Sequence, residues 1–317
     1  MTHGGNGRCE NERCSDSSGN PDAEHEMTIL RTESNPNHHC HEEDRSEYET
    51  MPTDVNDGDI SENTVLQPSS QPTQMSLVIF KIRLFQLSTQ ICRHISGPQR
   101  LDTASLYRFD TAIAGEQEQW TSMFLVDGAP SLLDITGYAS WCVLQTYAHQ
   151  LYLLLHRPFC NYHSDRAHFI QSSRDRCVES SLALLDLHRQ FCELPRLRNY
   201  QWLVYGLTSF NALHGAVALA SCLLDRPNDL DSAAYCTAFD DTIRRMESLQ
   251  ERSPVCVKAL PILRHIQTQL FPDHTHQPGR EDGFDSTFES WIDAVQWFNP
   301  ESINWDLWNH ELGTDAG

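Results

Sequence analysis

The stretch Tyr147-Ala-His-Gln-Leu-Tyr-Leu-Leu-Leu-His-Arg-Pro-Phe-Cys160 decides the fold class of this 317-residue chain. Its apolar residues recur at helical spacing, and Pro158 ends the run because proline removes a backbone donor and disfavours helix in the residue before it. No side chain in the run has an evident chemical task. We therefore predict a packed helix over residues 136–156, and we interpret His156, Arg157 and Pro158 as helix-end structure.

Helical periodicity extends over most of the chain on both sides of this stretch. Further helices are predicted at 77–95, 102–114, 166–192, 201–224, 229–250 and 254–270. Gly97-Pro98 ends the first of them, residues 120–130 form a loop, and Ser253-Pro254 opens the last as cap and first-turn proline. Sustained alternation and Asn-Gly hairpin signals are absent, so almost no sheet is expected. The sequence predicts an all-α, irregular multi-helix bundle over residues 75–271.

Residues 201–224 carry no charged side chain and are long enough to cross a bilayer. Thr208, Ser209, Asn211 and His214 fall in the middle of this run, where each would face lipid at a cost. A central helix surrounded by its neighbours explains the same pattern, because such a helix is apolar nearly all round. We favour the buried helix over a membrane span.

Both ends of the chain differ in composition from the predicted bundle. Residues 1–74 are polar and punctuated by turn formers, which predicts a disordered or extended acidic lead-in. Residues 272–317 form an acidic tail rich in Trp and Phe, and from 281 onwards it contains no Lys or Arg. The formal net charge of −21 argues against non-specific nucleic-acid binding, because such a chain repels phosphate. Eleven irregularly spaced cysteines without an export signal indicate reduced thiols in an intracellular protein.

Catalytic and metal-binding patterns are sparse. There is no phosphate-binding glycine loop and no nucleophile elbow. The nearest match to the Asp-rich magnesium motif of a terpene cyclase, Asp240-Asp-Thr-Ile-Arg244, has arginine in place of the third carboxylate. His38-His-Cys-His41 cannot direct all its side chains at one ion, and Cys9 with Cys14 are too few for structural zinc. We therefore predict no enzyme activity, no catalytic, cofactor-binding or metal-binding residue, and no cofactor.

Single histidines stand on several of the predicted helices. We interpret these as packed or partly exposed side chains rather than ligands: His149, His156, His188, His214 and His265.

Four segments in order resemble the fungal-specific transcription factor domain, the regulatory domain of zinc binuclear cluster factors. They are Met51-Pro-Thr-Asp-Val-Asn-Asp-Gly-Asp-Ile60, Pro72-Thr-Gln-Met-Ser76, Leu154-Leu-His-Arg-Pro-Phe159, and residues 172–187 with Cys177. In that family the second segment precedes a helix, the third ends one, and the fourth is a helix with a Cys-x-x-Ala-Ala core. The resemblance covers roughly residues 50–270.

The resemblance implies a nuclear regulator of transcription that works through protein partners, either the transcription machinery or a related factor in a homo- or heterodimer. Many such proteins control metabolic or secondary-metabolite gene clusters. The family's six-cysteine, zinc-binding, DNA-reading module is missing from this sequence, as is the first half of the regulatory domain, so contact with DNA is expected only indirectly. The chain is then a truncated gene product, a mis-predicted gene model, or a regulator that does not itself bind DNA.

Three alternatives remain open from the sequence. The acidic tail resembles an activation segment, but Trp291 and Trp297 could instead fold back onto the bundle, which we favour for residues 284–298. The chain could be a helical inhibitor that dimerises with a full-length factor. The least favoured reading is a helical enzyme.

Overall fold

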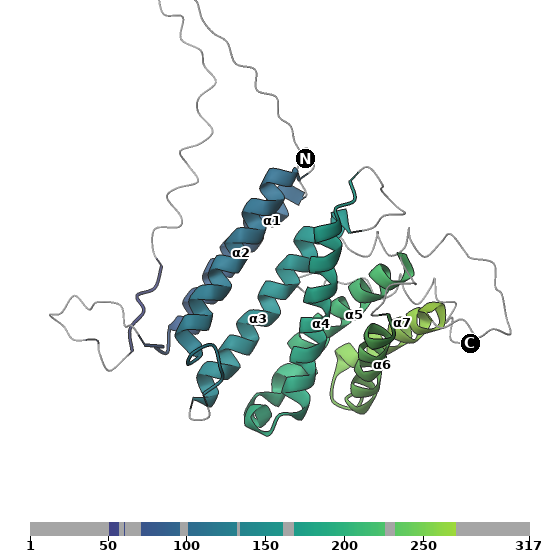
Figure 1. Cartoon of the computed structure of the whole chain (residues 1–317). Coiled ribbons are helices and arrows are strands. Elements are labelled where there is room, and N and C mark those ends of the chain that lie inside the picture. Colours follow the sequence, from purple (N-terminus) through teal and green to yellow (C-terminus); the bar gives the residue numbers. More distant parts are fainter. Residues whose placement is uncertain are drawn as a thin grey trace, which may run out of the picture. The chain divides into compact units, whose positions relative to one another are not determined.

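The computed structural model describes residues 51–56, 60, 71–95, 101–131, 134–160, 168–225 and 232–270. The chain divides into two compact units, Met1–Thr50 and Met51–Gly317, and every described residue lies in the second. Helices form most of the described part, whose only β-type pairing is an isolated bridge between Val126 and Ala129 (Figure 1). The predicted all-α bundle is confirmed.

Seven α-helices and two 3-10 segments make up the described part of the chain. In order they are α1 (Ser76–Ile95), α2 (Thr103–Phe124), α3 (Ile135–His156), η3 (Arg157–Phe159), α4 (Gln171–Glu193), η4 (Pro195–Tyr205), α5 (Leu207–Asp225), α6 (Ser232–Ser248) and α7 (Pro254–Leu270).

The helices pack in an order that follows the chain. α1 and α2 lie against one side of α3, α4 lies against its other side, and α5 packs on α4 (Figure 1). α6 and α7 then cover α5. α3 is buried nearly all round, and not only on the single face that its apolar spacing suggests. It is therefore a core helix, like α5.

The end of α2 lies ten residues beyond the predicted end at 114. We expected a loop over 120–130, but Trp120 and Phe124 are buried residues of this helix, and the loop begins only at Leu125. The polar run from Gly115 to Gln119 resembles a helix stop. The helix continues because Ile113, Trp120 and Phe124 extend its apolar face at helical spacing.

The charge-free segment 201–224 is not one helix. Its first five residues belong to η4, and α5 begins only after Gly206. Among the described residues α5 is the one helix long and apolar enough to cross a membrane, and most of it is buried inside the bundle. Its burial agrees with the predicted central helix. The serine, threonine and histidine side chains within it bond to neighbouring elements: Thr208, Ser209 and His214.

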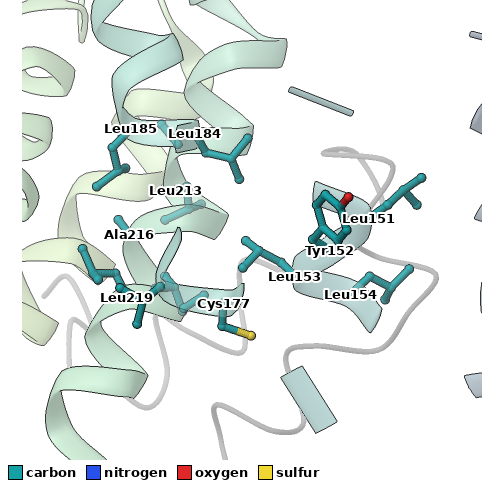
Figure 2. Close-up of a cluster of buried hydrophobic side chains, with 14 of the residues drawn as sticks. Leu151, Tyr152, Leu153, Leu154, Cys177, Leu184, Leu185, Leu213, Ala216 and Leu219 are labelled. Carbon is teal, nitrogen blue, oxygen red and sulfur yellow. The ribbon is translucent and has the colours of Figure 1, made fainter. Parts of the chain in front are cut away.

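α4 and α5 make the most extensive contact between any two of the described helices. A Cβ built on Gly215 would lie 3.0 Å from the Ser181 backbone oxygen and 3.1 Å from Leu184 Cβ. The missing side chain lets the two helices approach, so that Leu184 and Leu185 of α4 pack beside Leu213 and Ala216 of α5 (Figure 2).

Some predictions fall outside the described residues. These are the disordered lead-in over 1–50, the stop at Gly97-Pro98, the tail from 272 onwards, the His38–His41 cluster, and Cys9 with Cys14. α4 begins at Gln171 rather than 166. The predicted start of α6 at 229 lies outside the described residues, within which the helix runs from Ser232. The eight described cysteines are free thiols, and five of them are buried.

Candidate functional site

The predicted helix end at His156, Arg157 and Pro158 is confirmed. α3 ends at His156, and Pro158 stands in the first turn of η3. Phe159 is buried, and its carbonyl accepts the Ile170 amide at 2.9 Å just before α4 begins. The turn therefore directs the chain from α3 toward α4.

His156 is the centre of a polar cluster that joins three helices. Its Nε2 lies 2.8 Å from Asp110 Oδ1 of α2, and its Nδ1 lies 3.0 Å from Ser173 Oγ of α4. Arg176 of α4 donates to both oxygens of Asp110, at 3.2 and 3.3 Å, and stacks over the Tyr152 ring. We call Asp110, His156, Ser173 and Arg176 the polar clamp.

Within the clamp, Ser173 contacts His156 and His156 contacts Asp110, the same order of contacts as in a nucleophilic triad. Ser173, however, has no exposed surface, so no substrate can reach its hydroxyl. Asp110 is also shared with the Arg176 guanidinium. Burial would raise the pKa of Asp110, but the His156 hydrogen bond and the Arg176 charge together lower it below its usual value. The arrangement fits a structural joint between α2, α3 and α4.

A second polar chain links α2 and α3 beside the clamp. The Tyr152 hydroxyl donates to Gln117 Oε1 at 2.9 Å, and Gln117 is in turn hydrogen-bonded to Gln145 at 2.6 Å. Burial raises the pKa of Tyr152 above its ordinary value, which keeps the phenol protonated. These groups satisfy one another inside the bundle and offer no acid or base for catalysis near neutral pH.

Two histidines, one on α4 and one on α5, are buried and neutral. His188 Nε2 lies 3.2 Å from Ser209 Oγ, and His214 Nδ1 lies 3.2 Å from Gln150 Nε2. Burial, and secondarily the Arg245 charge, lowers the pKa of His188 to about 3. Burial, and secondarily the Arg157 charge, lowers the pKa of His214 to about 3. His188 joins α4 to α5 and His214 joins α5 to α3, so they are separate packed side chains rather than a joint ligand set.

Three buried thiols meet where η3, α4 and α5 join: Cys160, Cys177 and Cys222. The neighbouring Cys160 sulfur, together with burial, raises the pKa of Cys177 and of Cys222, so neither is an activated thiolate. No group of three or more His, Cys, Asp or Glu side chains in the described part of the chain is arranged to hold a metal ion.

The segments quoted for the family resemblance meet in pairs. Asp54 Oδ1 accepts hydrogen bonds from the hydroxyls of Thr73 and Ser76, and Asn56 Oδ1 accepts the Gln74 amide at 3.1 Å. The first two segments thus build the N-terminal cap of α1 together. The His156–Ser173 contact of the clamp joins the other two. The sequence predicts neither contact, because the partners lie 17 or more residues apart.

Charge is distributed very unevenly along the chain. Residues 75–270 contain 18 Lys or Arg and 18 Asp or Glu, so the helical part is formally neutral. Residues 1–74 contain 16 acidic and 4 basic residues, and residues 271–317 contain 10 acidic and 1 basic residue. The whole net charge of −21 therefore resides in the two flanks.

Comparisons with models of known protein families, with curated proteins and with solved structures find no match to this chain.

Proposed function

We propose that this chain is the helical regulatory domain of a fungal zinc-cluster-type transcription factor, acting in the nucleus through protein partners. The observation that carries the proposal is the pairing of the four resembling segments. Asp54 meets Thr73 and Ser76, and His156 meets Ser173. Residues that resemble one family at four separate places thus hold the same bundle together.

The polar interior supports an interaction role over a catalytic one. Ser173 of the clamp is inaccessible, and the pKa values of the buried His188, His214, Cys177 and Cys222 are shifted toward their neutral forms, whereas hydrogen bonds from Cys177 and Cys222 lower the pKa of the fully enclosed Cys160. A bundle of this kind presents surfaces to partners. Its acidic, aromatic C-terminal flank has the composition of segments that bind apolar grooves of coactivators.

A reporter assay tests the proposal directly. The full chain is fused to a heterologous DNA-binding domain, beside a version that ends at Arg280. We expect activation by the full chain and its loss in the shortened one. A control replaces Trp305 and Trp308 by Ala and keeps every acid, which separates the aromatic contribution from charge. Silence of the full-chain fusion would remove the activation function.

The alternative hypothesis, that the chain is a helical inhibitor of a full-length factor, predicts a different result in the same reporter cells. An inhibitor would be silent as a fusion, would co-purify with a zinc-cluster protein, and would lower that factor's output when overexpressed. Inspection of the genomic DNA upstream of Met1 for an in-frame six-cysteine module tests whether a DNA-reading domain precedes this sequence.

A further inference from the structure

The three thiols that meet beside the end of α3 form a connected group. Cys160 follows η3, Cys177 lies on α4, and Cys222 lies on α5. Each is exposed by 2% or less. The Cys177 and Cys222 thiols both hydrogen-bond to the Cys160 sulfur. One sulfur therefore contacts two others, each from a different helix, and we call these three side chains the thiol cluster.

Hydrogen bonds on either side hold Cys160 against the first turns of α4. The carbonyl just before Cys160 in the chain accepts the Ile170 amide at 2.9 Å, where α4 begins. His156, four residues before Cys160, lies 3.0 Å from the hydroxyl of Ser173, four residues before Cys177. In Figure 2 the Cys177 sulfur points toward the α3 side of the core. The contact of Cys160 with Cys177 is therefore part of the same α3–α4 junction as the clamp.

The surroundings of Cys160 favour its thiolate. The hydrogen bonds from Cys177 and Cys222, with the Arg157 charge, hold the pKa of Cys160 below its usual range and outweigh the effect of burial. The same contacts raise the pKa of Cys177 and of Cys222. The cluster thus sets one nucleophilic sulfur beside two protonated thiols. Redox-sensing sites pair a thiolate with a second, resolving thiol in the same way.

Of the three thiols, Cys160 has the shortest route to solvent. It stands at the end of the three-residue turn η3, in which Pro158 is exposed and Arg157 is half-buried. One hydrogen bond, from the Cys160 amide to the Arg157 carbonyl at 3.2 Å, closes this turn. Opening of a single short turn is a low-energy local fluctuation, and hydrogen peroxide is little larger than water. Cys177, inside α4, has no exposed surface.

We propose that Cys160 is a site of oxidation by hydrogen peroxide and forms a reversible disulfide with Cys177. The Cys160 thiolate attacks one peroxide oxygen and becomes a sulfenic acid, while the other oxygen leaves as hydroxide and is protonated to water. The Cys177 sulfur then attacks the Cys160 sulfur, and the sulfenic oxygen leaves with the Cys177 proton and the proton it already carries, as a second water. Two thiols are oxidised and one peroxide is reduced.

The disulfide closes covalently the α3–α4 junction that the clamp holds by hydrogen bonds. A thiol reductant breaks the disulfide again by exchange, so the junction follows the redox state of its surroundings. The inference does not rest on the proposed function, because it concerns only the chemistry of the cluster.

Mass spectrometry of the full chain tests the pairing. The reduced protein is treated with hydrogen peroxide, unfolded in urea, alkylated at its remaining thiols and digested. We expect a linked peptide pair that joins Cys160 to Cys177, and its disappearance when dithiothreitol precedes alkylation. A disulfide from Cys160 to Cys222 would refute Cys177 as the partner. Cys160 that is still alkylated after a peroxide dose that oxidises free cysteine would overturn the proposal.

Two alanine variants test which sulfur the peroxide attacks. In Cys160→Ala, oxidation of Cys177 should be at least about tenfold slower than in the parent, because the reactive thiolate is gone. Cys142→Ala removes an equally buried thiol that neighbours Tyr138, and as the matched control it should form the disulfide at the parental rate. Circular dichroism checks that each variant is folded, and the mapping on the parent chain requires neither variant. Oxidation of Cys177 at the parental rate in Cys160→Ala would refute Cys160 as the attacked sulfur.

Discussion

The polar clamp and the α4–α5 interface hold the same helix, α4, in opposite ways. At the clamp, Asp110 accepts hydrogen bonds from both His156 and Arg176, and its pair with Arg176 is ionic. At the α4–α5 interface, Gly215 lets the backbones approach, and His188 is buried in neutral form beside Ser209 of α5. His214 of α5 is buried in neutral form beside Gln150 of α3. The Asp110–Arg176 pair of the clamp is strongest when both groups are charged, whereas the packing around α5 depends on His188 and His214 staying uncharged.

Lowering the pH should destabilise the two regions to the most different extents. The pKa values of His188 and His214 are about 3 in the folded chain, against about 6.5 when unfolded. The unfolded state therefore binds more protons below pH 6.5, and stability falls with pH until the folded pKa is reached. Each histidine should cost about 2 kcal/mol between pH 7 and pH 5. The lowered pKa of Asp110 keeps the clamp ionised through that range.

Urea unfolding at pH 7, 6 and 5 measures how steeply the free energy of unfolding falls with pH. The double variant His188→Gln with His214→Gln should lose about two-thirds of the histidine contribution to this slope, whatever its stability at pH 7, because burial also lowers the pKa of His149 to about 4. His94→Gln, an exposed histidine on α1, serves as the control and should keep the slope of the parent. Equal slopes in all three proteins would show that the buried histidines do not titrate with unfolding.

The clamp should break when its shared acceptor is removed. Asp110→Ala leaves His156 and Arg176 without that carboxylate, and Arg176 is only partly exposed. The expected loss is about 3 kcal/mol, since removing one partner strands the others. Asp241→Ala, which breaks the exposed pair with Arg244, should change stability by about 0.5 kcal/mol or less. Denaturant midpoints compare the two, and equal losses would contradict a special role for the clamp.

Alanine substitutions at two helical glycines, one inside the α4–α5 contact and one outside it, test this contact. Gly215→Ala should destabilise by about 1–2 kcal/mol, because its Cβ meets the Ser181 carbonyl oxygen, whose backbone cannot easily yield. Gly115→Ala on α2 meets no atom within 4 Å and should stabilise by up to about 1 kcal/mol through helix propensity. Thermal unfolding of both measures the difference. A stabilising Gly215→Ala would mean that the helices can separate at no cost.

The sequence predicts the helices because their signals are local. Pro158 ends α3, and Ser253 caps α7 by accepting the Cys256 amide at 3.2 Å, as expected from the chain alone. The local signal fails where Gly115 and four polar residues interrupt an apolar pattern, and in η4, where a 3-10 segment resembles the start of the following helix.

The clamp could not be predicted, because its members are far apart in sequence. Asp110 lies 46 residues from His156 and 66 from Arg176, and no spacing rule connects them. The same holds for Asp54 with Ser76, 22 residues apart. A single histidine on an apolar helix indicates burial, but its partner is set by how the helices pack.

The smallest expected effect lies at Asn211, inside the α4–α5 interface. Its side-chain oxygen and nitrogen are buried and have no hydrogen-bond partner, which costs desolvation free energy. In the clamp, by contrast, the His156 and Arg176 nitrogens that face Asp110 are hydrogen-bonded to it. Asn211→Leu removes an unsatisfied amide and keeps a similar volume, so it should stabilise by about 1 kcal/mol. Asn211→Ala is the comparison, because it removes the amide but leaves a cavity, and it should be close to neutral. Chemical denaturation of both variants measures the difference. If Asn211→Leu destabilises the protein, the amide is bonded in solution, and the interface then satisfies its polar groups as completely as the clamp does.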